Sequence, residues 1–333
     1  MDAGDLHRDA IVFDATCPLF SLPAYRGWWR EGGATAVAAE VAAEESPGEA
    51  LLALGRWHRT IGEDPDLCLV TGVDQFAECK AQGRLGVVFH FQNSLPIGRD
   101  ADSVWAYAAM GVRMIQLAYN VRNLVGDGCD ERTDAGLSDF GVRVVRALND
   151  AGIVVDLTHT GARTSLDALE LSSAPPVFSH SNAKALAPSA RNLTDEQIRK
   201  LADRGGVIGM NGFPPFVGAD PQPTLDRFID HIAYIADLVG VEHVGLGLDY
   251  YPFTDGVAPL AEAERAYDEL IASGRWKRDT YPPPPHRWPE GLERPSGLPR
   301  LTRRLLERGF SAAEVEGILG GNFLRVFRAA WKP

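Results

Sequence analysis

Two histidines and an aspartate stand out in this sequence because their side chains suit metal-assisted hydrolysis. His159, His180 and Asp249 each come directly after an apolar run. Neutral imidazole nitrogens and carboxylate oxygens are common ligands of zinc and other divalent transition metals. A lone histidine at the end of a strand is usually structural. Three such residues at the ends of different strands therefore favour a metal-dependent hydrolase site.

Short apolar runs supply the strands that must position these residues. The runs are rich in Val, Ile, Leu and Gly and show little alternation of polar and apolar residues. That composition is typical of parallel strands buried on both faces. Eight strands are predicted, at 10–13, 34–39, 86–91, 112–118, 153–157, 176–179, 207–210 and 243–248.

Helical stretches lie between these strands. Apolar residues recur at helical spacing in 141–149 and 224–238. Thr194 with Gln197 forms a capping box, and Ser311 with Glu314 forms another, which opens a last helix through Trp331. Alternating strands and helices predict an α/β fold, a (β/α)8 or TIM barrel, in a single domain over residues 1–333. An open doubly wound sheet is the alternative, but no Gly-rich phosphate loop follows the first strand.

In such a barrel the active site lies at the carboxyl ends of the strands. We therefore expect the polar residues at these ends to meet at one mouth. They are Asp14, Thr16, Gln92, Asn93, Tyr119, Asn120, His159, His180, Asn211 and Asp249.

One segment, at about 250–299, is too long for a simple connection. It contains four consecutive prolines at 282–285, together with Trp276, His286 and Trp288. One interpretation is a surface excursion or an oligomer contact, as in a homodimer. The other is a lid over the barrel mouth.

Composition limits the partners of the protein. The 333 residues carry a formal net charge of −12, which disfavours nucleic acid and anionic membranes. No apolar stretch of about 18 residues predicts a membrane span, and the acidic start does not look like a signal peptide. The four cysteines, Cys17, Cys68, Cys79 and Cys129, contain no CxxC pair and predict no disulfide framework. We expect a cytoplasmic protein that acts on a small molecule.

Four segments resemble the membrane (renal) dipeptidase family, peptidase family M19. They are Val-Val-Asp-Leu-Thr-His at 154–159, Pro-Val-Phe-Ser-His-Ser-Asn at 176–182, Gly-Leu-Gly-Leu-Asp at 245–249, and Gly-Asn-Phe-Leu-Arg-Val-Phe at 321–327. The resemblance implies an amidohydrolase-like barrel with two zinc ions bridged by a glutamate. It implies that His159 and His180 bind metal. It places Arg191, with Asn192, at the substrate carboxylate, and Asp249 beside the attacking water and the substrate amine.

The sequence departs from the family at several of these positions. Thr16 and Pro18 stand where the family has a metal-binding His-x-Asp pair, and Gln92 stands where it has the bridging glutamate. Tyr119 replaces a substrate-polarising histidine. We therefore expect at most one metal ion per chain, zinc or another divalent transition metal, on His159 and His180 with Asp249 or Gln92.

The remaining polar residues receive roles accordingly. Asp249 and Tyr119 are the candidate catalytic residues, and Arg191, Asn192, Gln92 and Asn120 the candidate substrate-binding residues. Glu131 could supply a missing carboxylate or only pair with Arg132 in its loop. Cys129 and Cys17 could be soft ligands or nucleophiles, or simply buried thiols.

The expected function is hydrolysis of a dipeptide, or of a small amide bearing a carboxylate, by a metal-activated water. One alternative is a divergent barrel enzyme with one metal or none that acts on another small carboxylate. Another is a binding protein that keeps the pocket without the chemistry, since fold does not determine function.

Overall fold

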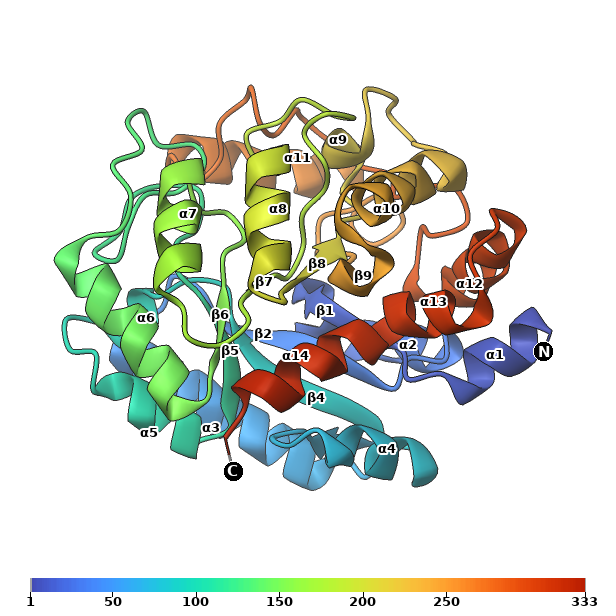
Figure 1. Ribbon diagram of the computed structural model, residues 1–333, viewed down its shortest axis with the longest axis horizontal. Helices are drawn as coiled ribbons and strands as arrows, with labels where there is room; N and C mark the ends of the chain where they lie inside the picture. Colours follow the sequence, from blue (N-terminus) through green and yellow to red (C-terminus); the bar gives the residue numbers. More distant parts are fainter. Residues whose placement is uncertain (1, 333) are drawn as a thin grey trace.

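The structure, a computed structural model that describes residues 2–332, is a barrel of parallel strands surrounded by helices (Figure 1). Eight of the nine strands form one continuous series, and β3 pairs only with β4, outside the series. The predicted barrel is confirmed. The strands are β1 Phe13–Cys17, β2 Ala36–Ala42, β3 Leu67–Leu69, β4 Leu85–Phe91, β5 Val112–Gln116, β6 Val154–Asp156, β7 Val177–Phe178, β8 Val207–Met210 and β9 Val244–Leu246.

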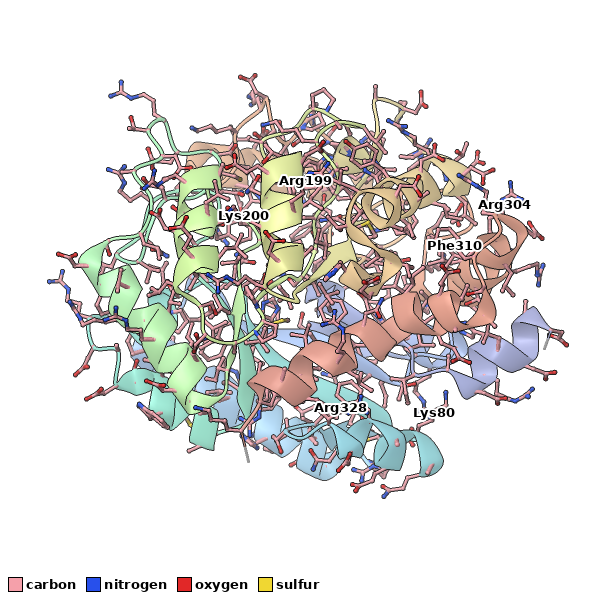
Figure 2. All side chains as sticks on the ribbon, viewed as in Figure 1. Lys80, Arg199, Lys200, Arg304, Phe310 and Arg328 are labelled. Carbon is pink, nitrogen blue, oxygen red and sulfur yellow. A yellow bond between two sulfur atoms is a disulfide. The ribbon has the colours of Figure 1, made fainter. Side chains whose placement is uncertain are left out.

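Helices cover the outside of the barrel, and charged side chains such as those of Arg199 and Lys200 point outward from them (Figure 2). The main helices are α1 Ala3–Asp9, α2 Gly27–Glu31, α3 Pro47–Glu63, α4 Asp74–Ala81, α5 Ser103–Ala109, α6 Asp139–Ala151, α7 Ala162–Leu171, α8 Asp195–Asp203, α9 Pro214–Val217, α10 Leu225–Val239, α11 Leu260–Ala272, α12 Leu298–Glu307, α13 Ala312–Glu316 and α14 Asn322–Ala330. Short 3-10 turns lie at Pro18–Ser21, Pro23–Tyr25, Leu95–Ile97, Val241–His243 and Pro295–Gly297. None of the described helices is both long and apolar enough to cross a bilayer.

Both predicted capping boxes are present, at the starts of α8 and α13. The predicted last helix is interrupted, because a π-helical turn at Gly317–Gly321 separates α13 from α14. This break lets α14 turn under the barrel, where the rings of Phe323 and Phe327 meet Phe13 edge to face at 5.4 Å.

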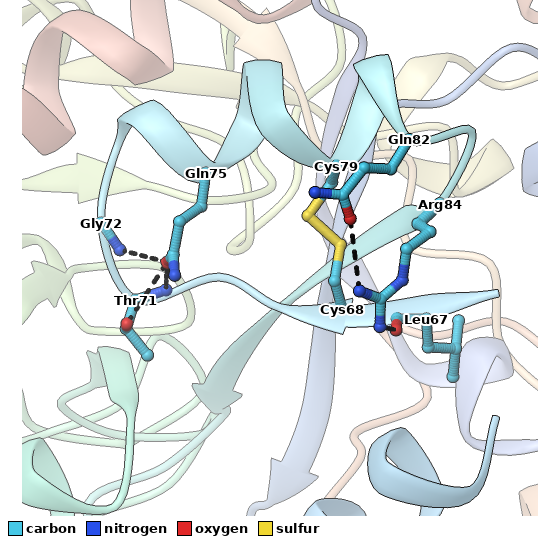
Figure 3. Close-up of a disulfide and its surroundings, with 8 residues drawn as sticks. All are labelled: Leu67, Cys68, Thr71, Gly72, Gln75, Cys79, Gln82 and Arg84. Carbon is cyan, nitrogen blue, oxygen red and sulfur yellow. Dashed lines mark hydrogen bonds between the residues drawn. A yellow bond between two sulfur atoms is a disulfide. The ribbon is translucent and has the colours of Figure 1, made fainter. Parts of the chain in front are cut away.

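Three features differ from the prediction. The first strand was expected at 10–13 but begins at Phe13, because Ala10 caps α1. Strand β3 was missed, since three residues that pair on one side only leave little periodic signal. Its Cys68 is joined by a disulfide to Cys79 of α4 (Figure 3), a pairing that the cysteine pattern did not predict.

A buried carboxylate helps to close the barrel between β9 and β1. No regular ladder joins these two strands. Instead, the backbone N–H of Asp249 donates to the Thr16 carbonyl at 3.2 Å. The side chain of Asp14, which is fully buried, accepts hydrogen bonds from the Leu248 N–H at 2.9 Å and the Trp29 indole at 3.0 Å. Asp14 therefore satisfies the Leu248 N–H, which a longer strand pair would otherwise bind, and also the buried Trp29 indole.

Residues of the segment at 250–299 pack against residues at the expected barrel mouth. The Trp276 indole donates to the Tyr119 hydroxyl at 3.2 Å, and the Tyr281 hydroxyl donates to Asn120 Oδ1 at 3.1 Å. The Arg275 carbonyl accepts from Asn120 Nδ2 at 3.0 Å. These contacts tie the segment to residues that follow β5, at the expected site.

We predict that Asp14→Ala lowers the free energy of unfolding, because each unsatisfied buried donor costs about 1–3 kcal/mol. Asp14→Asn should cost less, since its amide oxygen still accepts one hydrogen bond. Urea denaturation measures both, with Asp203→Ala on the exposed end of α8 as the control. Equal stability of the Asp14→Ala and Asp203→Ala variants would contradict this role.

Candidate active site

Strained backbone marks the barrel mouth. The non-glycine residues with positive φ in the described chain are Asn120, His159 and Asp249, with φ values of 58°, 65° and 59°. All three were predicted as site residues from their positions after strands. The left-handed conformation is unfavourable for residues with a Cβ and is found where function requires a particular side-chain direction.

His159 and His180 point their rings at each other. Their Nε2 atoms are 2.9 Å apart, and both side chains are buried. Which of these nitrogens carries a proton depends on the partners of the Nδ1 atoms, because in a neutral imidazole one nitrogen donates and the other accepts.

Two hydroxyl groups determine the tautomer of His180. Its Nδ1 lies 2.8 Å from Ser179 Oγ and 3.0 Å from Thr16 Oγ1. The Ser179 hydroxyl donates to Asp156 Oδ2 at 2.5 Å, and the Thr16 hydroxyl donates to the Ala15 carbonyl at 2.7 Å. Because each hydroxyl already donates its proton to another acceptor, each can only accept a hydrogen bond from His180. His180 therefore carries its proton on Nδ1, and its Nε2 presents a lone pair.

An amide determines the tautomer of His159 in the same way. Its Nδ1 lies 2.7 Å from Asn120 Oδ1. Asn120 Nδ2 donates to the Arg275 carbonyl, which identifies Oδ1 as the acceptor. His159 therefore also carries its proton on Nδ1. Two Nε2 lone pairs face each other, an arrangement that repels unless a cation lies between or beside them.

The surroundings keep both rings neutral. Burial, followed by the charge of Arg191, lowers the pKa of His159 and of His180 well below the usual histidine value. Burial alone would raise the pKa of Asp156, but the hydrogen bond and charge of His90 outweigh it and keep the carboxylate ionised. Asp156 therefore stays a negatively charged acceptor for the Ser179 hydroxyl.

The third predicted residue, Asp249, lies beside this pair. Its Oδ2 is 3.9 Å from His180 Nε2 and accepts from Asn211 Nδ2 at 3.3 Å. Burial raises the pKa of Asp249 to about 7. The carboxylate can therefore hold or release a proton near neutral pH.

The donor set does not fit the two-ion centre expected from the resemblance. Among residues 2–332, no group of three or more His, Cys, Asp or Glu side chains is arranged to hold a metal. Thr16 orients His180, and the neutral Gln92 offers no charge. The paired imidazole lone pairs do fit one ion, because metal-binding histidines typically donate their other N–H to a fixed acceptor.

The loop after β5 supplies no further ligand. The Glu131 carboxylate accepts from the backbone N–H groups of Arg122 and Arg132, and the expected ion pair with the Arg132 side chain is not formed. Cys129 Sγ lies 3.4 Å from Asn120 Oδ1, and burial raises the pKa of Cys129 to about 12. Burial also raises the pKa of Cys17 well above its usual value. Both cysteines are thiols at neutral pH rather than thiolates.

A cavity of about 150 Å³, called the mouth cavity here, opens on one side of His159. Tyr119 forms part of its wall and stacks on the His159 ring at 4.0 Å. Burial raises the pKa of Tyr119, so its hydroxyl keeps its proton. Gln92, 3% exposed, has no partner for its Nε2 donor. The lining residues are Pro18, Glu40, Ala43, Gln92, Tyr119, His159, Phe213, Phe216, Asp249, Tyr251, Pro252, Phe253, Leu270, Arg275, Trp276 and Tyr281.

Glu40 in this cavity was not anticipated. In β2, Ala36 and Ala38 pack in the barrel interior, so alternation directs Glu40 inward too, and it pairs in register with His90. Burial, with smaller effects of Glu45 and Glu44, raises the pKa of Glu40 to about 7. A signal was available in the sequence: Glu40 directly follows the predicted strand 34–39, the second strand, for which no end residue was considered.

A second cavity, of about 180 Å³ and called the arginine cavity here, also has His159 in its lining. Arg191, Ser181 and Asn192 line it. Each has a buried polar atom without a partner: Arg191 Nε, Ser181 Oγ and Asn192 Oδ1. Arg191 is 2% exposed and makes no ion pair within the described chain, so the alternative pairing with Asp195 is absent. Its charge is available to a ligand.

Asn120 and Asn192 are bound more tightly into the protein than expected for substrate contacts. Asn120 uses both ends of its amide to hold His159 and the segment at 250–299. Asn192 Nδ2 donates to the carbonyls of Ala187 and Phe216, and only its Oδ1 remains free.

We predict that Glu40→Gln stabilises the metal-free protein at pH 8.5 and has little effect at pH 4. A glutamate whose folded pKa is raised to about 7 binds a proton more tightly when folded. It therefore costs stability as pH rises from about 4.5 through 7. The gain should be on the order of 1–3 kcal/mol, measured by urea denaturation at both pH values. A variant that is destabilised at pH 8.5 would show that Glu40 already has a favourable partner.

Comparison with known proteins finds relatives of this chain in sequence and in fold. The model of the membrane dipeptidase family (Peptidase family M19) matches residues 32–278 and 285–332. An amidohydrolase from Pseudomonas aeruginosa superposes with a TM-score of 0.89 at 29% identity, over 99% of each chain. A metallo peptidase from Rhodobacter sphaeroides shares the fold, with a TM-score of 0.78 at 22% identity over 97% of this chain and all of that one.

Curated relatives are longer than this chain. An uncharacterized dipeptidase of Schizosaccharomyces pombe is 34% identical over 66% of this chain and 47% of its own length. The dipeptidase tcpJ of Claviceps purpurea is 32% identical over 70% of this chain and 48% of its own length. The chain thus matches about half the length of these relatives. On its family match over most of its length, this chain belongs to the membrane dipeptidase family, peptidase family M19.

Proposed function

We propose that this protein is a hydrolase that uses one divalent metal ion per chain to cleave a dipeptide or another small amide bearing a carboxylate. The observation that carries the proposal is the pair of Nε2 lone pairs on His159 and His180, which face each other at 2.9 Å. Hydrogen bonds from both Nδ1 atoms hold them there. Family membership favours a peptidase-type reaction.

His159 and His180 would hold the ion, with Asp249 as the nearest carboxylate. Zinc or a similar ion would polarise a carbonyl there and lower the pKa of water toward neutrality. Two protein nitrogens leave coordination positions open, as in catalytic rather than structural sites.

Arg191 would bind the substrate carboxylate in the arginine cavity. Its unpaired Nε and the unpaired Ser181 Oγ are both buried donors. A carboxylate would satisfy them and neutralise the guanidinium, whose planar fork suits two parallel hydrogen bonds. The scissile amide would then lie against His159, between the two cavities.

Asp249 and Tyr119 would manage the protons of the reaction. With a pKa of about 7, Asp249 can take a proton from the attacking water and return it to the leaving amine. Tyr119 remains protonated at neutral pH and can donate to the developing negative charge on the carbonyl oxygen. The unpaired Gln92 Nε2 offers a second donor from the mouth cavity.

We predict that the purified protein binds one zinc ion per chain. His159→Asn and His180→Asn should each weaken zinc binding at least about tenfold, since each removes one of two nitrogen ligands. Calorimetric titration and elemental analysis measure this, with His58→Asn on the exposed face of α3 as the control. Chelation should abolish hydrolysis of a panel of dipeptides and N-acyl amino acids, and zinc should restore it. Two tightly held ions per chain, or full affinity in both variants, would refute the single-ion site.

We predict that Arg191→Lys weakens transition-state binding of a carboxylate-bearing amide by about 1.5–3 kcal/mol, the value of a hydrogen bond to a charged group. The loss is measured as a fall in kcat/KM. An ammonium keeps the charge but cannot form the paired hydrogen bonds. The melting temperature should barely change. The matched substrate control is the same amide with its carboxylate replaced by a carboxamide, which should lose little. Equal losses for both substrates would assign Arg191 to structure.

A further inference from the structure

We infer that the substrate carries a positively charged alkylammonium group, which binds in the mouth cavity against Glu40 and the surrounding aromatic rings. The inference rests on the proposed function, because it names the class of small amide that the same site would accept. It concerns the mouth cavity, whose lining does not include Arg191, and does not depend on the carboxylate contact.

Glu40 is an inward carboxylate without a partner of its own. Within residues 2–332 it forms no hydrogen bond or ion pair through its side chain. The nearby cation, Arg275, is engaged elsewhere: its Nη2 lies 3.5 Å from Glu44 Oε1, and its guanidinium stands 5.3 Å over the Tyr119 ring. The cavity lining therefore holds two carboxyl groups, Glu40 and Asp249, and one cation, Arg275. The charge of Arg191 already acts on Asp249, which leaves Glu40 as the carboxyl group that a cationic ligand can bind.

The walls of the cavity suit an alkylated cation rather than a hydrated one. They are mainly aromatic, with Phe213, Tyr251, Trp276 and Tyr281 from the loop after β8 and the segment at 250–299. Aromatic faces attract alkylammonium groups and exclude water. The resulting low dielectric strengthens attraction to a buried carboxylate. Trp276 and Tyr281 stack at 4.3 Å and form a flat wall.

Gln92 provides an independent sign that the cavity receives a ligand. It lines the cavity, is 3% exposed, and has an Nε2 donor with no partner. Unpaired buried donors are costly unless something binds them. A ligand that places an ammonium group at Glu40 and a carbonyl oxygen near Gln92 would satisfy both residues. An amide with an alkylammonium end has both groups.

Choline and its neutral isostere, 3,3-dimethyl-1-butanol, test this inference directly. The two probes have nearly the same shape and differ in charge. By calorimetry on the zinc-loaded full chain, we expect choline to bind at least about tenfold more tightly, equivalent to 1.4 kcal/mol. Glu40→Gln should abolish that preference and leave the weak binding of the isostere unchanged. Glu63→Gln, the same change on the exposed end of α3, should retain it.

Three results would overturn the inference: equal affinity for both probes in the unmodified chain, a preference that survives Glu40→Gln, or loss of zinc from the Glu40→Gln variant. The last would make Glu40 a metal ligand instead. Because the assay measures binding without turnover, its outcome is separate from that of the proposed hydrolysis. A choline preference without amidase activity would support the cation site and count against the hydrolase.

Discussion

Two imidazole nitrogens held face to face are the constraint on which the rest of the site depends. Neither ring is free to turn, because Asn120 holds His159 from one side and Ser179 with Thr16 holds His180 from the other. The Ser179 hydroxyl is in turn oriented by the buried Asp156 carboxylate. The protein thus holds two lone pairs in mutual repulsion, and a metal ion bound by both nitrogens would relieve it.

This arrangement lowers the free energy of unfolding of the protein. Asn120, His159 and Asp249 adopt positive φ, at a cost of roughly 1–3 kcal/mol each. Glu40 and Asp249 stay in surroundings that raise both pKa values to about 7. Such costs are typical of functional sites, where local preference and global fold disagree. Closure of the barrel through Asp14, together with the packing of the 250–299 segment, holds these residues in place.

The positions where the resemblance implies metal ligands or a substrate-polarising histidine make other contacts in this protein. Thr16 accepts a hydrogen bond from His180 and fixes its tautomer. Tyr119 stacks on His159 and closes one side of the mouth cavity. Gln92 leaves an unpaired donor where a charged residue would bind metal. Two of these three residues, Thr16 and Tyr119, position the histidines that remain.

The sequence alone determined the barrel, because buried parallel strands are nearly uniform in apolar composition and alternate with helices. It also located His159, His180, Asp249, Tyr119 and Gln92, since residues directly after such strands must meet at one mouth, and the family resemblance added Arg191. Tertiary structure decided what local patterns cannot encode. The tautomers depend on Asn120 and Thr16, which come from other parts of the barrel, and on the Asp156 carboxylate that orients Ser179. Glu40 becomes a site residue only when the direction of its side chain is known. The 250–299 segment packs at the mouth because its aromatic residues find partners far away in the chain.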